Sequence, residues 1–478
     1  MKLQIMDPAA AAERGATLHH VVAMPYPGRG HINPMMNLCH LLSSRSTSNS
    51  FLFTFVVTEE WLGFIGSDSK PANVRFATVP NVVPSELVRA ADMQGFVAAV
   101  QTKLEEPFEQ LLDRLEPPAK LIIADTFLQW AVQVGNRRNI PVASFWPMSA
   151  SVFSIFYHFD LLVQNQHFPV ELSRAHESVD YIPGLSAMCL ADLPTIFYEQ
   201  GSKNLHRAVD AVSVVPRAQY LLFTSVSELE LEAIDALKAK LPIPVYTFGP
   251  NIPYFKLVDN PSSTTHSDGD HSYFKWLDSK PQETVLYFSL GSFLSVSSAQ
   301  MDEIAAGLKK SGVPNLWVAR AESSRFSEVC DSGGLIVPWC DQLRVLSHSS
   351  VGGFWTHCGW NSVMESVYCG VPMITLPILM DQIPNSKLIV NDWKTGWKVK
   401  EATETEKLVK RDEIAHLVRR FMDLKGTERK EITKKAKELQ EVCRQTITSG
   451  GSSNKSLGAF IKDIEQGILD ASSSNSAA

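Results

Sequence analysis

Short apolar segments alternate with amphipathic segments along most of this chain, and this alternation constrains the fold more than any other feature. In the first half, HHVVAMPYP, FLFTFVVTE, AKLIIADTF and IPVASFWP alternate with helical patterns such as INPMMNLCHLLSSR and WAVQVGNRRN. A second series begins at TVLYFSLGS and continues through NLWVAR, GLIVPW, VGGFWTH and VPMITLP. Such alternation is typical of βαβ units. It predicts an α/β protein with two halves, each built on a parallel sheet.

The length of the chain supports the same division, because 478 residues exceed what one hydrophobic core usually holds. Pro, Ser, Thr, Asp and Gly displace the apolar periodicity in one stretch, which we interpret as a linker. It contains Asp268-Gly269-Asp270, which we interpret as a solvated loop and not as a metal site. The expected organisation is a flexible N-terminus (1–18), an N-terminal domain (19–250), the linker (251–272), a C-terminal domain (273–455), a helix that packs back on the N-terminal domain (456–470) and a disordered tail (471–478).

Composition excludes several classes of function. The 44 Lys and Arg residues are outnumbered by 51 Asp and Glu residues, so nucleic acid is not an expected partner. No stretch offers the roughly 18 uninterrupted apolar residues of a membrane span, and charges interrupt the first residues where a signal peptide needs an apolar core. Seven scattered cysteines without a C-x-x-C pair favour a reducing compartment. We expect a cytoplasmic monomer without membrane insertion.

The segment FWTHCGWNSVMESVYCGVP (354–372) concentrates polar side chains between a predicted strand and a predicted helix. In a parallel sheet this turn lies at the carboxyl end of a strand, and the helix beyond it offers unpaired N–H groups to an anion. Gly359 permits close approach of the backbone, and His357, Asn361 and Ser362 can donate hydrogen bonds to a phosphate. Glu365 lies on the same helix face, where a carboxylate suits a donor pair such as a ribose diol. Alone, Asn361 or Ser362 could be only an N-cap.

Two residues of the first half lie at the ends of predicted strands. His31 follows HHVVAMPYP just before a helix, and Asp125 ends LIIAD. The two side chains could therefore meet at one edge of the sheet, although a single histidine is more often structural. The stretch GRGHINP lacks the third glycine of a dinucleotide fingerprint, which argues against a nicotinamide site.

The stretch WCDQLRVLSHSSVGGFWTHCGWNSVMESVYCGVPMITLPILMDQ (339–382) resembles the signature box of plant family 1 UDP-sugar-dependent glycosyltransferases. The resemblance extends from PYPGRGHINP through WLDSKPQETVLYFSLGS to this box. It implies the GT-B fold, in which two Rossmann-like domains face each other and the C-terminal domain holds most of the donor. It also implies a hexosyltransferase that uses no metal or other cofactor.

The resemblance assigns a role to each donor-site position. Trp339 would stack on uracil, with Cys340 and Gln342 near the uridine and Glu365 on the ribose. Ser292, His357, Asn361 and Ser362 would meet the diphosphate. Trp360, Asp381 and Gln382 would face the hexose. The chain departs from the usual pattern at Cys340-Asp341, where Ala-Pro is commoner. Because the uracil contact in the family is partly made by the backbone, we expect this departure to do little harm.

In the resembling family, His31 and Asp125 would form the catalytic dyad. His31 would take the proton of the acceptor hydroxyl, and Asp125 would fix the histidine tautomer. The segments 144–159, MQGF (93–96) and TIFY (195–198) could wall an apolar acceptor cleft, although any one of these residues could equally belong to the core. From them and their surroundings we select Phe127, Trp146, Ser149 and Phe197 as acceptor-binding candidates.

The expected activity is an inverting transfer of glucose from UDP-glucose to a hydroxyl of a small lipophilic plant metabolite, with a flavonoid or another phenolic favoured. Gln382 resembles glucose-using members. A terpenoid or hormone acceptor is one alternative, and a nucleotide-sugar-binding protein without catalysis is another. A nicotinamide oxidoreductase ranks third.

Overall fold

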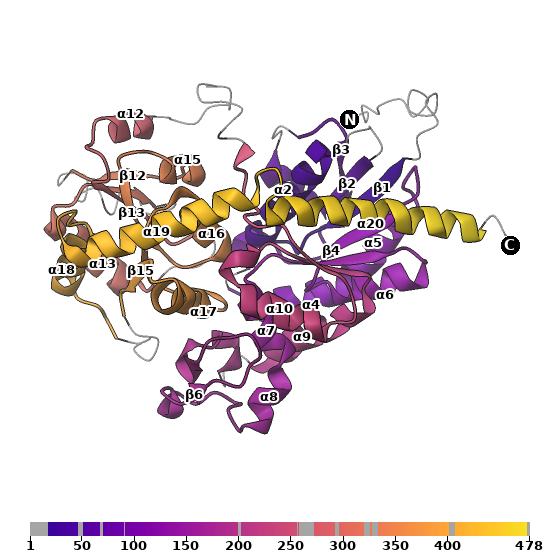
Figure 1. Ribbon diagram of the computed structural model, residues 1–478, viewed down its shortest axis with the longest axis horizontal. Coiled ribbons are helices and arrows are strands. Elements are labelled where there is room, and N and C mark those ends of the chain that lie inside the picture. The colour runs from indigo at the N-terminus through magenta and orange to yellow at the C-terminus, as the bar shows by residue number, and fades with distance from the viewer. Residues whose placement is uncertain are drawn as a thin grey trace.

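A computed structural model gives the fold of this chain (Figure 1). It describes residues 18–45, 51–66, 70–89, 91–198, 202–255, 257, 272–291, 296–319, 326, 333–400 and 407–475, with the backbone alone at 202–203 and 468–475. Most of the expected N-terminus (1–18), most of the expected linker (251–272), the Asp268-Gly269-Asp270 motif and Ser292 lie outside these residues. Two α/β domains stand side by side, as the sequence predicts.

The N-terminal domain contains a seven-stranded sheet with the order β3-β2-β1-β4-β5-β8-β9, and every pairing in it is parallel. Its strands are β1 (His19–Met24), β2 (Phe51–Thr58), β3 (Val74–Val79), β4 (Leu121–Asp125), β5 (Val142–Trp146), β8 (Tyr220–Phe223) and β9 (Val245–Thr247). A short antiparallel pair, β6 (Ser178–Val179) with β7 (Met188–Cys189), lies outside the sheet. Because β1 and β4 are neighbours, their carboxyl ends meet at one edge.

Successive side chains of a strand point to opposite faces of the sheet. Because helices cover both faces, both sets of side chains are buried. Val21 and Ala23 pack with one helix layer, whereas Val22 and Met24 pack with the other. The helices are α2 (Arg29–Arg45), α3 (Glu59–Ile65), α4 (Met93–Lys103), α5 (Glu105–Leu112), α6 (Gln129–Arg137), α7 (Ala150–Tyr157), α8 (Phe159–Gln164), α9 (Ser202–Val214) and α10 (Leu231–Lys240). Short 3₁₀ turns are η1 (Glu86–Val88), η2 (Leu172–Arg174), η3 (Leu190–Asp192), η4 (Thr195–Phe197), η6 (Val215–Arg217) and η7 (Ser227–Leu229).

The C-terminal domain repeats this design with a six-stranded parallel sheet of order β12-β11-β10-β13-β14-β15. Its strands are β10 (Val285–Ser289), β11 (Asn315–Val318), β12 (Leu335–Val337), β13 (Val351–Thr356), β14 (Met373–Thr375) and β15 (Gly396–Lys398). Its helices are α12 (Ser272–Asp278), α13 (Ser298–Ser311), α15 (Gln342–Leu346), α16 (Trp360–Cys369), α17 (Gln382–Lys387), the π-helix η8 (Leu388–Asp392), α18 (Arg411–Phe421) and α19 (Thr427–Thr446). The helix α16 ends at Gly370, whose φ of 68° few other residues adopt.

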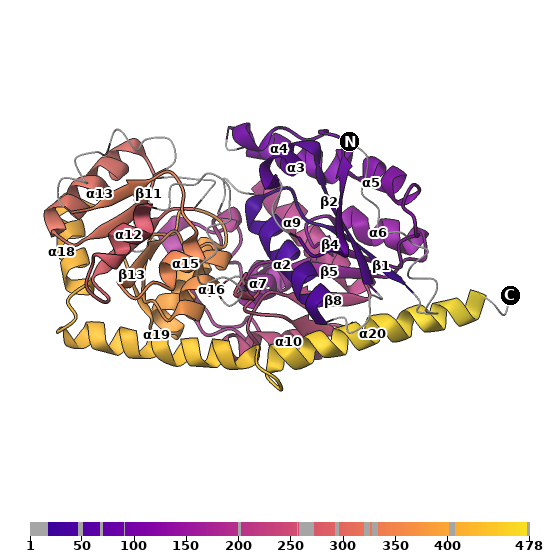
Figure 2. The same ribbon diagram turned by 90° about the horizontal axis from the view of Figure 1, so that it is seen from above.

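The last helix, α20 (Ser452–Asn475), returns from the C-terminal domain to the N-terminal one (Figure 2). Phe460 is fully buried among the rings of Tyr220, Tyr246 and Phe248. The helix starts before the expected residue 456 and continues into the segment 471–478, which we expected to be disordered, as far as Asn475.

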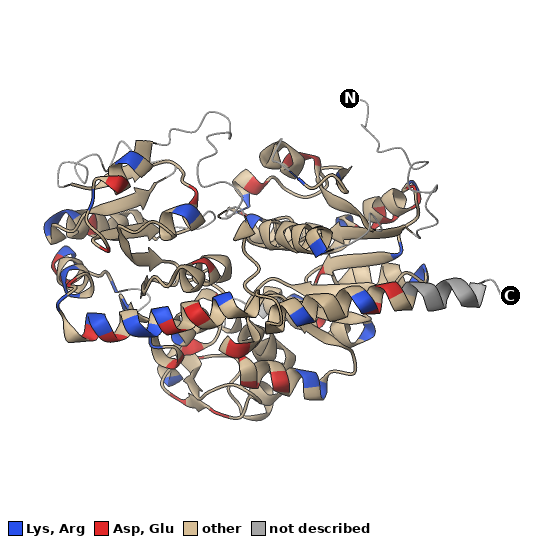
Figure 3. Ribbon diagram, turned by 45° about the horizontal axis from the view of Figure 1, so that its top comes forward, with Lys and Arg blue, Asp and Glu red and all other residues tan. Residues whose placement is uncertain are grey.

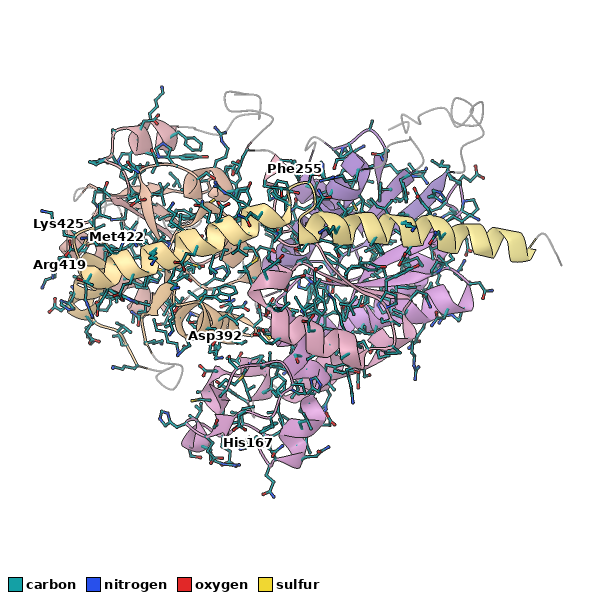
Figure 4. The ribbon with its side chains drawn as sticks, in the orientation of Figure 1. His167, Phe255, Asp392, Arg419, Met422 and Lys425 are labelled. Carbon is teal, nitrogen blue, oxygen red and sulfur yellow. The ribbon has the colours of Figure 1, made fainter. Side chains whose placement is uncertain are left out.

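Gly249, near the end of the N-terminal domain, touches the turn between α19 and α20, where the chain returns from the C-terminal domain. The carbonyl of Gly249 accepts hydrogen bonds from Thr446 Oγ1, at 3.3 Å, and from Ser453 Oγ. Shortly after Gly249 in the sequence, the ring of Phe255 stacks on His40 with a centroid separation of 5.1 Å (Figure 4). The end of the N-terminal domain and the turn between α19 and α20 therefore lie side by side.

Direct contacts also join the domains at a distance from this turn. Asp392 accepts two hydrogen bonds from the buried Lys387 ammonium, at 2.9 and 3.0 Å, and the same ammonium donates to Ser186 of the N-terminal domain (Figure 4). Trp393 Nε1 donates to the carbonyl of Leu229 at 3.2 Å. Charged residues of both signs are interspersed over the ribbon (Figure 3), in keeping with the net charge of −7.

Candidate active site

His31 and Asp125 meet at the carboxyl edge of the N-terminal sheet. His31 Nδ1 lies 2.7 Å from Asp125 Oδ2, and the other carboxylate oxygen accepts the backbone N–H of Phe127 at 3.0 Å. The carboxylate is fully buried, whereas the imidazole is 21% exposed. Because an ionised carboxylate can only accept, Nδ1 carries the proton and Nε2 remains an acceptor.

Local structure fixes the orientation of this imidazole. The first turn of α2 begins with backbone hydrogen bonds from His31 and Ile32 to the carbonyl of Gly28, both at 2.9 Å. The rings of Tyr26 and Phe127 lie 5.1 and 6.1 Å from the His31 ring, between centroids. The carboxylate holds one nitrogen of the imidazole between these rings, and His31 also lines a cavity.

Across from this dyad, the turn between β13 and α16 has a tightly constrained backbone. Cys358 adopts a φ of 68°, and its N–H donates to Thr356 Oγ1 at 3.1 Å. The His357 ring fills the space between two glycines, since a Cβ on Gly291 or Gly359 would lie only 2.5 or 2.6 Å from His357 Nε2. Burial lowers the pKa of His357 to about 4. The neutral ring can supply an N–H donor here but not a positive charge.

The first turns of α15 and α16 share a hydrogen-bond network. Gln342 Nε2 donates to Ser362 Oγ at 2.9 Å and to Glu365 Oε2 at 2.7 Å, and Gln342 Oε1 accepts from Tyr287 OH at 3.1 Å. Burial raises the pKa of Glu365 to about 7, although the hydrogen bond from Gln342 opposes that shift. Glu365 keeps one carboxylate oxygen for a ligand with hydroxyl donors.

Trp339 and Cys340 lie side by side in sequence but point to different surroundings. The Trp339 side chain is 60% exposed, which is unusual for so large an apolar ring and suits a surface for a flat ligand. The Cys340 thiol is buried, and its Sγ lies 3.4 Å from Tyr287 OH. The buried thiol leaves only the backbone of Cys340 for a contact with a ligand.

The loop before α17, which we call the sugar loop (376–382), is held from both sides. Gln382 Oε1 accepts the backbone N–H groups of Ile378 at 2.8 Å and Leu379 at 3.1 Å, so its amide nitrogen is turned outward as a donor. Asn385 donates to Asp381 at 2.9 Å, while burial raises the pKa of that carboxyl to about 6. Met380, with a φ of 59°, donates its N–H to Thr195 Oγ1 of the N-terminal domain at 2.8 Å.

A single cavity of about 990 Å³ joins the dyad region, His357 and the sugar loop. Both domains contribute to its wall, which includes Gly30, and the carbonyl of Gly30 accepts a hydrogen bond from Asn361 of the opposite domain at 3.0 Å. The wall includes His31 and Phe127 from the dyad region and His357, Asp381 and Gln382 from the opposite domain. The volume is in the range of small-molecule sites. A general base and a set of hydrogen-bond donors thus share one space.

Comparison with known proteins identifies this arrangement. The chain is 51% identical to UDP-glycosyltransferase 87A2 from Arabidopsis thaliana over 447 residues, which cover 93% of this chain and 96% of the relative. It belongs to the plant family 1 UDP-glycosyltransferases. The family model described as "UDP-glucoronosyl and UDP-glucosyl transferase" matches residues 212–411. The protein is accordingly a glycosyltransferase enzyme, as the sequence predicts.

Solved structures confirm the GT-B fold of this glycosyltransferase. Os79 from O. sativa, solved in complex with UDP, superposes with a TM-score of 0.81 at 25% identity and covers 93% of this chain and all of its own. UGT71G1 from Medicago truncatula, complexed with UDP-glucose, gives a TM-score of 0.80 at 25% identity, covering 94% of this chain and 98% of that one. The two parallel-sheet domains are therefore a shared architecture.

The residues that line the cavity of this glycosyltransferase do not include the following candidates from the sequence: Trp146, Ser149, Phe197, Trp339, Cys340, Gln342, Trp360, Asn361, Ser362 and Glu365. Trp146 and Phe197 are fully buried in the N-terminal core, and Ser149 is buried as the N-cap of α7, accepting from Val152 N at 3.2 Å. The Trp360 ring is 4% exposed and packs 6.3 Å from Trp393 inside the C-terminal core. Of the acceptor candidates, Phe127 lines the cavity. The side chains of the other three and of Trp360 are buried, and the roles expected of these residues stay predictions.

Several residues that line the cavity belong to the segments proposed for the acceptor cleft but are not among the individual acceptor-binding candidates. Met93 belongs to MQGF, Thr195, Ile196 and Tyr198 belong to TIFY, and Met148 follows the strand that contains Trp146. The sequence carried no signal for the following lining residues: Tyr26, Arg89, Val97, Gln101, Val170, Asn204, Arg207 and Ala208.

Within the described part of the chain, no group of three or more His, Cys, Asp or Glu side chains is arranged to hold a metal ion. The helices in that part also include none that is both long and apolar enough to cross a membrane.

Proposed function

We propose that this enzyme transfers glucose from UDP-glucose to a hydroxyl of a small lipophilic plant metabolite, with a phenol such as a flavonoid favoured. The observation that carries the proposal is the His31–Asp125 pair, which opens onto the same cavity as Asp381 and Gln382 of the sugar loop. The mostly apolar wall around Phe127, Met93 and Ile196 supports a lipophilic acceptor. Support for glucose comes from the Medicago truncatula relative complexed with UDP-glucose.

In the proposed reaction, His31 Nε2 accepts the proton of the acceptor hydroxyl while the hydroxyl oxygen attacks the anomeric carbon. The bond from that carbon to the phosphate oxygen breaks on the opposite face, so the configuration inverts and UDP leaves. Asp125 stabilises the imidazolium that forms, and solvent removes its proton afterwards. Negative charge on UDP would be met by His357, Asn361 and Ser362 and by the N–H groups that begin α16, so no metal is required.

Two alternatives remain for comparison. A terpenoid or hormone acceptor would suit the aliphatic part of the wall, and Os79 has been solved with a trichothecene, whereas Phytolacca americana UGT2 has been solved with the phenol pterostilbene. A nucleotide-sugar-binding protein without catalysis would need no base, which makes the short His31–Asp125 contact an argument for transfer.

The test incubates the protein with UDP-glucose and a panel of phenols, terpenoid alcohols and hormones, and identifies glucosides by mass spectrometry. Anomeric proton coupling in the product distinguishes inversion from retention, and EDTA should leave the rate unchanged. Replacing UDP-glucose with UDP-galactose or UDP-glucuronate tests the donor. An absence of every glucoside, with UDP still bound, would favour the binding-protein alternative.

His31→Ala should lower kcat by about 10²- to 10⁴-fold because the proton acceptor is lost. UDP affinity, measured by calorimetry, should stay the same, since His31 belongs to the other domain. His176→Ala, at an exposed histidine outside the cavity wall, is the matched control and should retain full activity. Equal activity of His31→Ala and the wild type would remove His31 from the mechanism.

A further inference from the structure

One cation interrupts the apolar part of the cavity wall. Met93, Val97, Phe127, Met148, Ile196 and Ala208 give this part its apolar character. Arg207 lines the same cavity from α9 and is partly buried, and Asn204, one turn earlier on that helix, lies beside it. A guanidinium in a largely apolar wall loses hydration, so it is expected to have an anionic or strongly accepting partner.

The other cations of this wall already have such partners. Arg89 NH1 lies 3.0 Å from Glu86 Oε2, and His31 is paired with Asp125. Arg207 differs, because its hydrogen bond runs from NH1 to the amide oxygen Asn204 Oδ1 at 3.3 Å. Among the described residues, no carboxylate lies within ion-pair distance of Arg207.

The carboxylate of Glu171 also lines the cavity, but it does not fill this role. Its residue is exposed, and Oε2 accepts from Ser173 Oγ at 3.4 Å. Solvent screens an exposed carboxylate of this kind. Since Asn204 is the only hydrogen-bond partner of Arg207 among the described residues, most of its five N–H donors remain for a molecule in the cavity.

We propose that the acceptor carries a carboxylate, in addition to the hydroxyl that reacts, and that Arg207 binds this carboxylate. The inference rests on the proposed function, since it names a feature of the acceptor used at the same site. A planar guanidinium matches a carboxylate through two parallel hydrogen bonds, and charged hydrogen bonds are stronger than neutral ones. Asn204 steadies the guanidinium through its amide oxygen. The hydroxyl is then directed to His31, at the other part of the cavity.

The test compares hydroxyaryl carboxylic acids with their methyl esters. 4-Hydroxybenzoate, 4-hydroxycinnamate and 4-(4-hydroxyphenyl)butanoate place the carboxylate at increasing distances from the hydroxyl. For at least one of them, the acid should show a KM about tenfold lower than its ester, because the ester loses the charged hydrogen bonds. The product should resist mild alkali, which cleaves a glucose ester but not an aryl glucoside, since the carboxylate is bound and does not react.

Substitutions then assign the preference to one side chain. Arg207→Gln should reduce the difference between acid and ester to less than about twofold, and Arg207→Lys should retain part of it. Arg174→Gln is the matched control, because Arg174 pairs with exposed Glu177 outside the cavity wall and should leave the preference intact. Thermal melting of each variant shows whether it is folded.

Failure of this inference can be distinguished from failure of the proposed function. Equal KM values for all acids and esters, or a preference that survives in Arg207→Gln, would overturn the role of Arg207 and leave glucosyl transfer standing. Calorimetric binding of the same acids and esters in the presence of UDP applies the test even without turnover. There too, an acid that binds no tighter than its ester would contradict the proposal.

Discussion

At the residue scale, Glu365 is the side chain whose charge state should control donor binding. Its pKa is raised to about 7 by burial, so the carboxyl is protonated below that pH and ionised above it. The ionised form is the better acceptor for a ribose diol. Uridine affinity should therefore rise about five- to eightfold between pH 6 and 7.5.

Isothermal calorimetry with uridine measures this effect without interference from phosphate groups that titrate in the same range. Glu365→Gln should bind uridine more weakly and with little pH dependence. A pH profile that persists in this variant would assign the titration to another group.

Individual residues also show where sequence reasoning ends. Glu365 and Gln342 were selected from their spacing in the box, and the structure joins them by a hydrogen bond of 2.7 Å. Trp146 and Phe197 were selected because they are large and apolar, but such residues occupy a core as readily as a cavity wall. Their rings pack inward, and smaller or more flexible neighbours such as Met148 and Thr195 line the cavity.

At the element scale, a hydrogen bond from Met380 N–H to Thr195 Oγ1 joins the sugar loop to the opposite domain. Thr195→Val removes this acceptor with little change in shape. Because UDP lacks the sugar, the variant should bind UDP normally but UDP-glucose about two- to tenfold more weakly, the effect of one hydrogen bond.

Calorimetry without acceptor gives this ratio of the two affinities, and Thr195→Ser, which keeps the hydroxyl, should behave like the wild type. An equal loss of affinity for UDP and UDP-glucose would show that the contact does not act through the sugar loop.

The elements themselves were predictable because parallel strands buried on both faces leave long apolar runs, as in β1 and β13. Because strands that alternate with helices run parallel, their carboxyl ends lie at the same edge of the sheet. This rule predicted that His31, after β1, and Asp125, at the end of β4, could meet. Contacts between domains, such as Asn361 with Gly30, were not predictable, because they join residues whose segments carry no complementary pattern.

At the scale of the whole molecule, α20 should contribute to stability although it lies away from the reaction. Phe460→Ala removes a fully buried ring from a cluster with Tyr220, Tyr246 and Phe248. The free energy of unfolding should fall by about 3–5 kcal/mol. Urea unfolding followed by fluorescence measures this change, and Lys462→Ala, at an exposed position of the same helix, is the control.

A wild-type unfolding curve for Phe460→Ala would mean that α20 is not packed on the N-terminal sheet in solution. Activity at low temperature should be retained in the folded fraction, since no cavity residue changes.

The junction at the Gly249 carbonyl restricts how the two lobes can part. Because the Gly249 carbonyl holds both the end of α19 and the start of α20, we expect a separation of the lobes to rotate about this turn. The greatest displacement then falls on the parts farthest from the pivot. Exchange of reactants and products can thus proceed while each sheet stays rigid, and a substitution at the pivot would alter release rates without touching a reacting group.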